Sequence, residues 1–109
     1  MKKVIIIGKL LINIPKVSEL TVKNVEVFAA TNLEQVKNVF DNNSNQIDIA
    51  ITGAGIDLEL RLEIVKYIFT TSNTTSVHMK DRASGPEGYL SFINNVLEGI
   101  LGKDYLKMV

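Results

Sequence analysis

Four short runs of apolar, mostly β-branched residues recur along this chain, and stretches with helical spacing of apolar residues separate the later ones. The first run, residues 4–7, is continuously apolar and ends at Gly8, which is typical of a strand buried on both faces. Short strands that alternate with amphipathic helices form a parallel sheet with helices on both sides. The sequence therefore predicts a three-layer α/β architecture with strands at 4–7, 25–30, 47–52 and 76–80.

Right-handed crossovers between successive parallel strands limit how the strands can be ordered. They favour the order 2-1-3-4, which is the flavodoxin-like arrangement of a four-stranded parallel sheet. Residues 9–24, between the first two strands, carry a weaker pattern. Because Pro15 pushes Ile14 toward an extended backbone, this segment is expected to hold at most a short helix around 16–20.

Two capping patterns mark expected helix starts. Thr31 is followed three residues later by Glu34, ahead of apolar residues at helical spacing. Ser84 is followed by Glu87 in the same way, ahead of an apolar stretch that stops at Gly102. In such a capping box the first side chain bonds a backbone N–H of the first turn and the glutamate bonds back, so neither pair is assigned a catalytic role.

The helix expected at 57–69 has more apolar surface than one face of a sheet can cover. Leu58, Leu62, Val65 and Phe69 fall on one stripe. Further apolar residues lie off that stripe. The excess predicts that the helix is either sandwiched within the domain or in contact with a partner.

Composition narrows the classes of function. The chain has 109 residues, 46% of them apolar, which suits one domain spanning 1–109. Lys and Arg number 12, and Asp and Glu also number 12, so the chain lacks the basic excess of a nucleic-acid-binding protein. With no cysteine and one histidine, the sequence offers neither a disulfide nor a thiolate or multi-histidine metal site. No stretch approaches the roughly 20 apolar residues of a membrane helix, so we expect a soluble, cytoplasmic protein. We also expect no cofactor.

The stretch VEVFAATNLEQVKNVFDNNSNQIDIAIT is similar to receiver domains of response regulators, from their second to their third strand. The stretch HMKDRASGPEGYLSFINNVL resembles the last strand, the lysine, the loop and the final helix of such domains, with Lys80 at the lysine position. The resemblance covers roughly two-thirds of the chain and rests on pattern and spacing. It implies a receiver-like fold.

The chain departs from the receiver pattern at the residues that would carry phosphorylation. The paired acids that follow the first strand of a receiver fall here on Gly8 and Lys9, and the phosphoacceptor aspartate falls on Gly53, five residues after Asp48. Without clustered carboxylates there is no Mg²⁺ site and no nucleophile for phosphoryl transfer. The stretch before the last expected strand is also too short for the usual fourth strand and helix. The resemblance therefore implies a shortened pseudo-receiver without phosphorylation chemistry.

Ligands of parallel α/β sheets bind beyond the carboxyl ends of the strands. In this chain those ends bring glycines and charges together, where free backbone N–H groups and cations could hold a small anion. The alternative is that the glycines form tight turns and the charges are solvated, as at the edge of any such sheet. The candidate ligand-binding residues of this strand-end rim are Gly53, Gly55, Lys80, Asp81 and Arg82.

His78 could act as a general base near neutral pH if a carboxylate oriented it. Asp57 and Asp81 are the carboxylates expected nearest to it, and Lys80 would complete the candidate catalytic set. However, His78 is expected in mid-strand rather than at a strand end. The sequence therefore favours a structural histidine at a sheet edge.

Two functions follow from these patterns and stay open. The first is a non-catalytic module that acts through protein association as a homodimer, with the 57–69 helix, Tyr89 and Phe92 as candidate interaction surface. The alternative is a small enzyme or binding protein for an anion or a nucleotide, which would use the strand-end rim.

Overall fold

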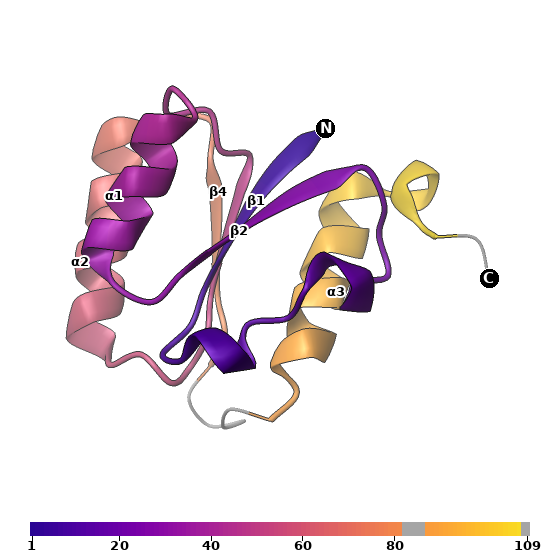
Figure 1. Ribbon diagram of the computed structural model, residues 1–109, viewed down its shortest axis with the longest axis horizontal. Coiled ribbons are helices and arrows are strands. Elements are labelled where there is room, and N and C mark those ends of the chain that lie inside the picture. Colours follow the sequence, from indigo (N-terminus) through magenta and orange to yellow (C-terminus); the bar gives the residue numbers. More distant parts are fainter. Residues whose placement is uncertain (82–86, 108–109) are drawn as a thin grey trace.

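A four-stranded parallel sheet forms the centre of the molecule (Figure 1). In the computed structural model, which describes residues 1–81 and 87–107, the strands lie in the order β2-β1-β3-β4 and every pairing is parallel. The predicted α/β class and strand order are therefore confirmed. The strands are β1 (Lys2–Ile7), β2 (Val25–Ala30), β3 (Ile49–Thr52) and β4 (Ser76–Met79).

The two central strands are apolar because both faces of the sheet are covered. Residues 4–7 of β1 are fully buried, and all four residues of β3 are buried. The edge strands β2 and β4 keep more of their surface in solvent. This difference is the one expected for a parallel sheet between two layers.

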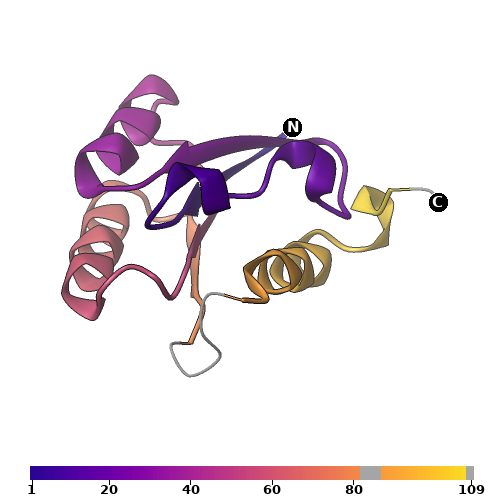
Figure 2. The ribbon, with the colours of Figure 1, turned by 60° about the horizontal axis from the view of Figure 1, so that its bottom comes forward.

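The two covering layers differ in their make-up (Figure 2). Helices α1 (Leu33–Asn42) and α2 (Leu58–Thr71) cover one face, whereas α3 (Tyr89–Leu101) and residues 9–24 cover the other (Figure 1). Because side chains alternate along a strand, β1 supplies Ile5 and Ile7 to the core under α1 and α2, and it supplies Val4 and Ile6 to the core under α3. Among residues 1–81 and 87–107, no helix combines the length and the apolar content that a bilayer crossing requires.

Residues 9–24 hold two single-turn 3₁₀ helices, η1 (Leu11–Asn13) and η2 (Val17–Glu19), in place of the short helix expected there. The segment still contributes apolar side chains to the core beneath α3, namely Ile14, Leu20 and Val22. It therefore covers this face of the sheet together with α3, although it forms no α-helix.

The C-terminal segment folds back onto the end of this same layer. After α3 the chain forms a third 3₁₀ turn, η3 (Lys103–Tyr105), and Leu106 makes an isolated antiparallel bridge with Val22. The Lys107 backbone N–H donates to the Thr21 carbonyl at 2.9 Å. The tail thus belongs to the layer that also contains α3.

Helix α1 is capped one residue later than the sequence predicted. Asn32, not Thr31, is the N-cap, and its side chain accepts a hydrogen bond from the Gln35 backbone N–H at 2.8 Å. The Gln35 side chain in turn accepts from the Thr31 N–H at 2.7 Å, so the reciprocal role falls to Gln35 and not to Glu34. The expected pattern is present, but asparagine and glutamine fill it, because they offer the same acceptors as threonine and glutamate.

Helix α3 also begins later than predicted. It starts at Tyr89 with Gly88 as its N-cap, so Glu87 precedes the helix and cannot complete a capping box in its first turn. Gly88 has a left-handed backbone, with φ of 79°, and an α-helix cannot continue through that conformation. Ser84 lies outside the described residues. The predicted end is confirmed, since α3 stops at Leu101 with Gly102 as its C-cap.

Helix α2 has two apolar faces, and only one of them lies against the sheet. Leu58, Leu62 and Phe69 of the stripe that the sequence shows are exposed. The helix has a second apolar face, which fits against the sheet and α1, where Tyr67 meets Phe40 edge-on with 5.8 Å between ring centroids. Apolar spacing alone cannot distinguish two such faces. The residues of α2 that are buried are Arg61, Ile64 and Ile68.

Candidate functional site

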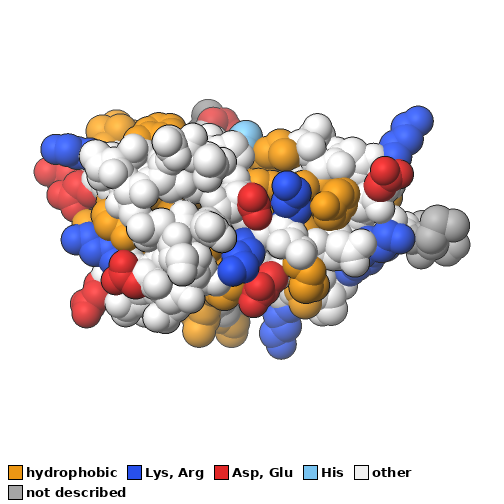
Figure 3. All heavy atoms as spheres, turned by 90° about the horizontal axis from the view of Figure 1, so that it is seen from above, with side chains coloured by type: hydrophobic (Ala, Val, Ile, Leu, Met, Phe, Trp, Pro, Cys, Tyr) orange, Lys and Arg blue, Asp and Glu red, His pale blue; other side chains and the backbone are white. Residues whose placement is uncertain are grey.

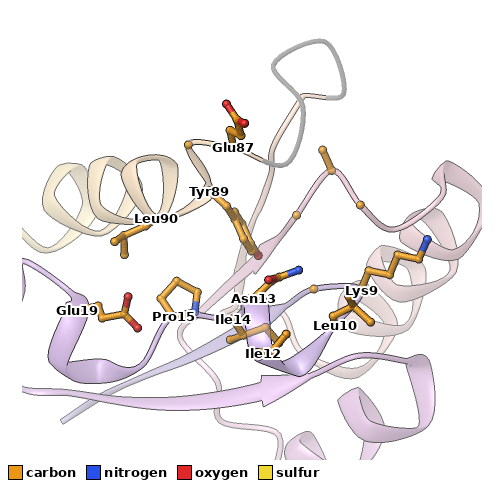
Figure 4. Close-up of a pocket in the computed structure, with 15 residues that line it drawn as sticks. Lys9, Leu10, Ile12, Asn13, Ile14, Pro15, Glu19, Glu87, Tyr89 and Leu90 are labelled. Atoms are coloured by element: carbon orange, nitrogen blue, oxygen red, sulfur yellow. The ribbon is translucent and has the colours of Figure 1, made fainter.

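A cavity of about 470 Å³ lies beyond the carboxyl ends of β1 and β3 (Figure 4). The loop after β1 and the loop after β3 form two of its walls, and the start of α3 forms a third. We call this cavity the strand-end pocket. Its lining residues are Gly8, Lys9, Leu10, Ile12, Asn13, Ile14, Pro15, Glu19, Gly53, Ala54, Gly55, Glu87, Gly88, Tyr89 and Leu90.

The topology of the sheet explains why the pocket opens at this place. After β1 the chain turns toward the face covered by α3, whereas after β3 it turns toward the face covered by α2 (Figure 1). The two neighbouring strands therefore send their loops in opposite directions and leave a crevice between them. Such a switch point is where open α/β sheets commonly bind ligands.

Two glycines keep the pocket open and its walls close to the strand ends. A Cβ atom at Gly53 would lie 3.1 Å from Cε2 and 3.2 Å from Cζ of Tyr89. A Cβ atom at Gly8 would lie 3.1 Å from Cγ1 of Ile14. Both distances are shorter than ordinary van der Waals contact, so larger residues here would push the walls apart.

Tyr89 anchors the wall of the pocket to the sheet. Figure 4 shows its ring reaching from the start of α3 toward the strand ends. The Tyr89 hydroxyl donates to the Ile7 carbonyl at 2.8 Å and also lies 3.2 Å from the Ile51 carbonyl, so it bridges β1 and β3. Burial raises the pKa of the Tyr89 phenol above its ordinary value, although the hydrogen bond to Ile7 acts in the opposite direction. Tyr89 is therefore a neutral hydrogen-bond donor whose role is to hold the wall in place.

The lining of the pocket is mainly apolar, with charges at its margin. Glu19 is engaged in its own loop, where its carboxylate accepts from the Lys16 backbone N–H at 3.0 Å. The amine of Lys9 points away from the ring of Tyr89 in Figure 4. The pocket thus offers an apolar surface and backbone groups, and the described residues that line it include no inward cluster of cations for a polyanion.

The structure divides the residues of the strand-end rim between different places. Gly53 and Gly55 line the pocket. Lys80 follows β4, is only 3% exposed and does not line this pocket. Asp81 is exposed and also lies outside the lining, and Arg82 lies outside the described residues. Both Lys80 and Asp81 have interaction partners.

His78 and Asp57, the candidate catalytic pair, are each bonded elsewhere. The Nε2 atom of His78 lies 3.2 Å from the Ser76 hydroxyl on the same edge strand. Burial lowers the pKa of His78, which favours the neutral ring at neutral pH. The Asp57 carboxylate accepts from the Leu60 backbone N–H at 2.8 Å and is the N-cap of α2. The structure therefore does not bring the two side chains together as a base and its orienting acid.

Two residues that sequence reasoning did not single out as site residues matter in the structure. Tyr89 was considered only as part of an interaction surface, because nothing local shows that its hydroxyl reaches two strand ends. Arg61 was not considered at all, although it falls in line with Ile64 and Ile68 and could have been noticed as a charge on an apolar face. Comparison of the chain with protein-family models, with characterised proteins and with solved structures found no match.

Proposed function

We propose that this chain is a non-catalytic, receiver-like module that acts by binding a second copy of itself through α2. One observation carries the proposal. Leu58, Leu62 and Phe69 are 50%, 53% and 61% exposed and lie on one side of α2. Figure 3 shows hydrophobic side chains reaching the surface over the end of the molecule that carries α1 and α2.

The spacing of these residues suits a helix–helix contact. Together with the partly buried Val65, they occupy positions 58, 62, 65 and 69, which is the alternation of four and three residues found in helices that pair along a seam. We call these four residues the α2 stripe. Large apolar residues that share one helix face and remain in water favour association, whereas scattered ones do not.

The charges beside the α2 stripe favour an antiparallel pair of identical helices. Glu59 and Glu63 lie along one flank of the stripe in the first half of α2, and Lys66 lies along the same flank in the second half. A two-fold axis that pairs the helices antiparallel brings the same flank of each copy together, with Glu63 of one copy beside Lys66 of the other. The zero net charge of the chain also means that two copies repel each other little.

The decisive experiment is sedimentation equilibrium over a concentration series that reaches high micromolar. We expect a monomer–dimer equilibrium for the wild type, and Leu62→Glu and Phe69→Glu should each weaken dimerisation at least about ten-fold, or about 1.4 kcal/mol. Ile100→Glu is the matched control, because Ile100 is 45% exposed on α3 and its substitution introduces the same charge. Circular dichroism establishes that each variant is folded.

The antiparallel arrangement has its own test. Glu63→Lys places two like charges in contact across the proposed interface, and Lys66→Glu does the same with the opposite sign. The double variant restores unlike pairs, so it should dimerise as the wild type does while each single variant dimerises less. A wild type that stays monomeric at all concentrations contradicts the whole proposal, and equal effects of Ile100→Glu and Leu62→Glu contradict the choice of surface.

A second candidate function is the binding of a small molecule in the strand-end pocket. Its volume of about 470 Å³ falls within the range of about 300–1,000 Å³ common for ligand pockets. Its mainly apolar lining favours a small apolar compound over a nucleotide. In a fragment screen followed by ¹H–¹⁵N spectra, binders should shift the signals of Gly8, Gly53 and Gly55, and hits that shift only the α2 stripe would count against this candidate.

The anion rim at Lys80, Asp81 and Arg82 stays a prediction. The expected cytoplasmic location also stays a prediction, which fractionation of cells that contain a tagged chain checks. The receiver-like part of the proposal is supported by the strand order β2-β1-β3-β4.

A further inference from the structure

Several backbone donors around the strand-end pocket are already bonded within the protein. The Gly8 N–H donates to the carbonyl of the last residue of β2 at 3.1 Å, and the Gly53 N–H donates to the carbonyl of the last residue of β1 at 2.9 Å. The N–H groups of Asn13 and Ile14 donate to carbonyls at the start of η1. Anions at such sites are held by free backbone N–H groups, and these four donors are not available to one.

Carboxylates outnumber cations around the same pocket. Among the described residues that line it, the charged ones are Lys9, Glu19 and Glu87. In Figure 4 the Glu19 carboxylate points toward Pro15, whereas Lys9 lies on the opposite side of the pocket with its amine pointing away. The charge that faces the apolar lining is therefore negative.

The Glu19 carboxylate has an oxygen atom left for a ligand. Its Oε1 accepts from the Lys16 backbone N–H at 3.0 Å, and in the part of the chain that the structure describes this is the one hydrogen bond of the carboxylate. A carboxylate has about four acceptor sites on its two oxygen atoms. The η2 turn thus holds Glu19 at the margin of the pocket and leaves its second oxygen able to accept.

The start of α3 is the feature of the pocket that favours an anion. The N-terminal N–H groups of a helix carry a partial positive charge of about half a unit. Glu87 stands two residues before Tyr89, the first residue of α3, so its full negative charge offsets that partial charge. The charge of Glu19 then decides which sign of ligand the pocket favours.

We propose that the strand-end pocket binds a small primary amine with an apolar body, as the ammonium ion. The inference rests on the second candidate function, the binding of a small molecule in this pocket, and names the class of that molecule. The ammonium group has three N–H donors and bonds the free oxygen of Glu19. The apolar body packs against Ile14, Tyr89 and Leu90, which line the same cavity of about 470 Å³.

Three compounds of similar size separate the effect of charge from the effect of shape. At pH 7 benzylamine is a cation, benzyl alcohol is neutral and benzoate is an anion. Each is titrated into the wild-type chain, and ¹H–¹⁵N spectra follow the signals of Gly8, Gly53 and Gly55. We expect the Kd of benzylamine to be lower than that of benzyl alcohol by about three-fold or more, and benzoate to bind most weakly.

Glu19→Gln tests the carboxylate that the proposal assigns. Glutamine keeps an oxygen that accepts from the Lys16 N–H, so the η2 turn is retained while the charge is removed. The variant should bind benzylamine and benzyl alcohol with equal Kd, and its Kd for benzyl alcohol should match the wild type. Glu34→Gln is the matched control, because it removes an exposed carboxylate of α1 outside the lining and should keep the preference for the amine.

The possible failures identify which proposal is wrong. Equal Kd values for benzylamine and benzyl alcohol in the wild type, or tightest binding of benzoate, overturn the amine proposal and leave a small-molecule site. Equal losses of preference in Glu19→Gln and Glu34→Gln overturn it as well, because the charge of the whole chain would then attract the amine. If neither the three compounds nor a fragment screen shifts the pocket glycines, the small-molecule site fails together with the amine proposal.

Discussion

The carboxyl ends of the strands contain two neighbouring regions with opposite properties. Between β1 and β3 there is a cavity of about 470 Å³, and the polar wall residue Tyr89 is bonded to two carbonyls. At the end of β3 and β4, toward α2, the structure contains buried polar atoms without partners, Nε of Arg61 and Oγ1 of Thr52. One region thus offers space beside a hydrogen-bonded wall residue, and the other contains buried polar atoms without partners.

The comparison shows that the surroundings of a strand end in this fold depend on which face of the sheet the following loop crosses, as well as on the strand itself. The loops after β1 and β3 part toward opposite faces and leave the strand-end pocket open. The loop after β3 leads directly into α2, which closes over Thr52 and buries Arg61. Shape suggests a ligand site at the first place, whereas the second place is enclosed and contains buried polar atoms without partners.

Removal of the Tyr89 ring should cause the largest loss of stability among the variants that test this comparison. Tyr89→Ala should lower the free energy of unfolding by about 3 kcal/mol, because it deletes a packed ring and leaves a void between α3 and the strand ends. Tyr89→Phe keeps the ring and loses the hydroxyl, so it should lower the free energy by about 1 kcal/mol. Urea denaturation measures both values. Equal losses in the two variants would show that the hydrogen bonds, not the ring, hold the wall.

A methyl group at Gly53 should strain the same wall from the strand side. In Gly53→Ala the new Cβ would lie 3.1 Å from the Tyr89 ring, which two carbonyls hold in place, so we expect a loss of about 1–2 kcal/mol. Gly99→Ala is the matched control, because no atom lies within 4 Å of its added Cβ in α3 and alanine favours a helix by about 0.5–1 kcal/mol. The two variants should therefore change stability in opposite directions, and a stabilised Gly53→Ala would mean that Tyr89 moves freely.

At the end of β3 and β4, substitution of Arg61 should change the free energy of unfolding less than the Tyr89 variants do, and in the opposite direction. Arg61→Met should leave the free energy of unfolding unchanged or raise it by about 1 kcal/mol, because methionine fills similar volume without a buried charge. Urea denaturation in chloride buffer checks this. A loss of more than about 2 kcal/mol would indicate that the bond to the Lys80 carbonyl already stabilises the guanidinium, and the contrast between the two regions would then weaken.

The pH dependence of stability should show the smallest effects, one from Tyr89 and one from His78. Because burial raises the pKa of Tyr89, its contribution is complete below the unfolded pKa of about 10 and is lost as pH rises above it. Because burial lowers the pKa of His78, its contribution is present above 6.5 and is lost as pH falls below that value. Tm measured from pH 5 to pH 11 in wild type, Tyr89→Phe and His78→Gln checks both signs. A Tyr89→Phe variant that still loses the same stability above pH 10 would contradict the assignment to Tyr89.

Sequence reasoning predicted the strands, their parallel order and the Gly102 stop, and it predicted Gly53 and Gly55 at the strand ends. It was wrong about the start of α3, and it did not decide which face of α2 is buried. In α2, the stripe that includes Leu62 and the face that includes Ile64 have similar apolar spacing, so a one-dimensional pattern could not choose between them. In α3, the local signal at Ser84 and Glu87 was outweighed by the left-handed conformation of Gly88, which a sequence does not show.

By itself, the sequence determined the architecture of this protein, because strand runs, helical periods and crossover handedness are local or nearly local properties of a chain. It also determined the balance of charge and the absence of cysteine chemistry. Only the tertiary structure decided which apolar face stays in water, which hydroxyl joins two strand ends, and that Arg61 is buried. These properties depend on residues far apart in the chain, such as Tyr89 with Ile7, and their distances are set only when the layers close around the sheet.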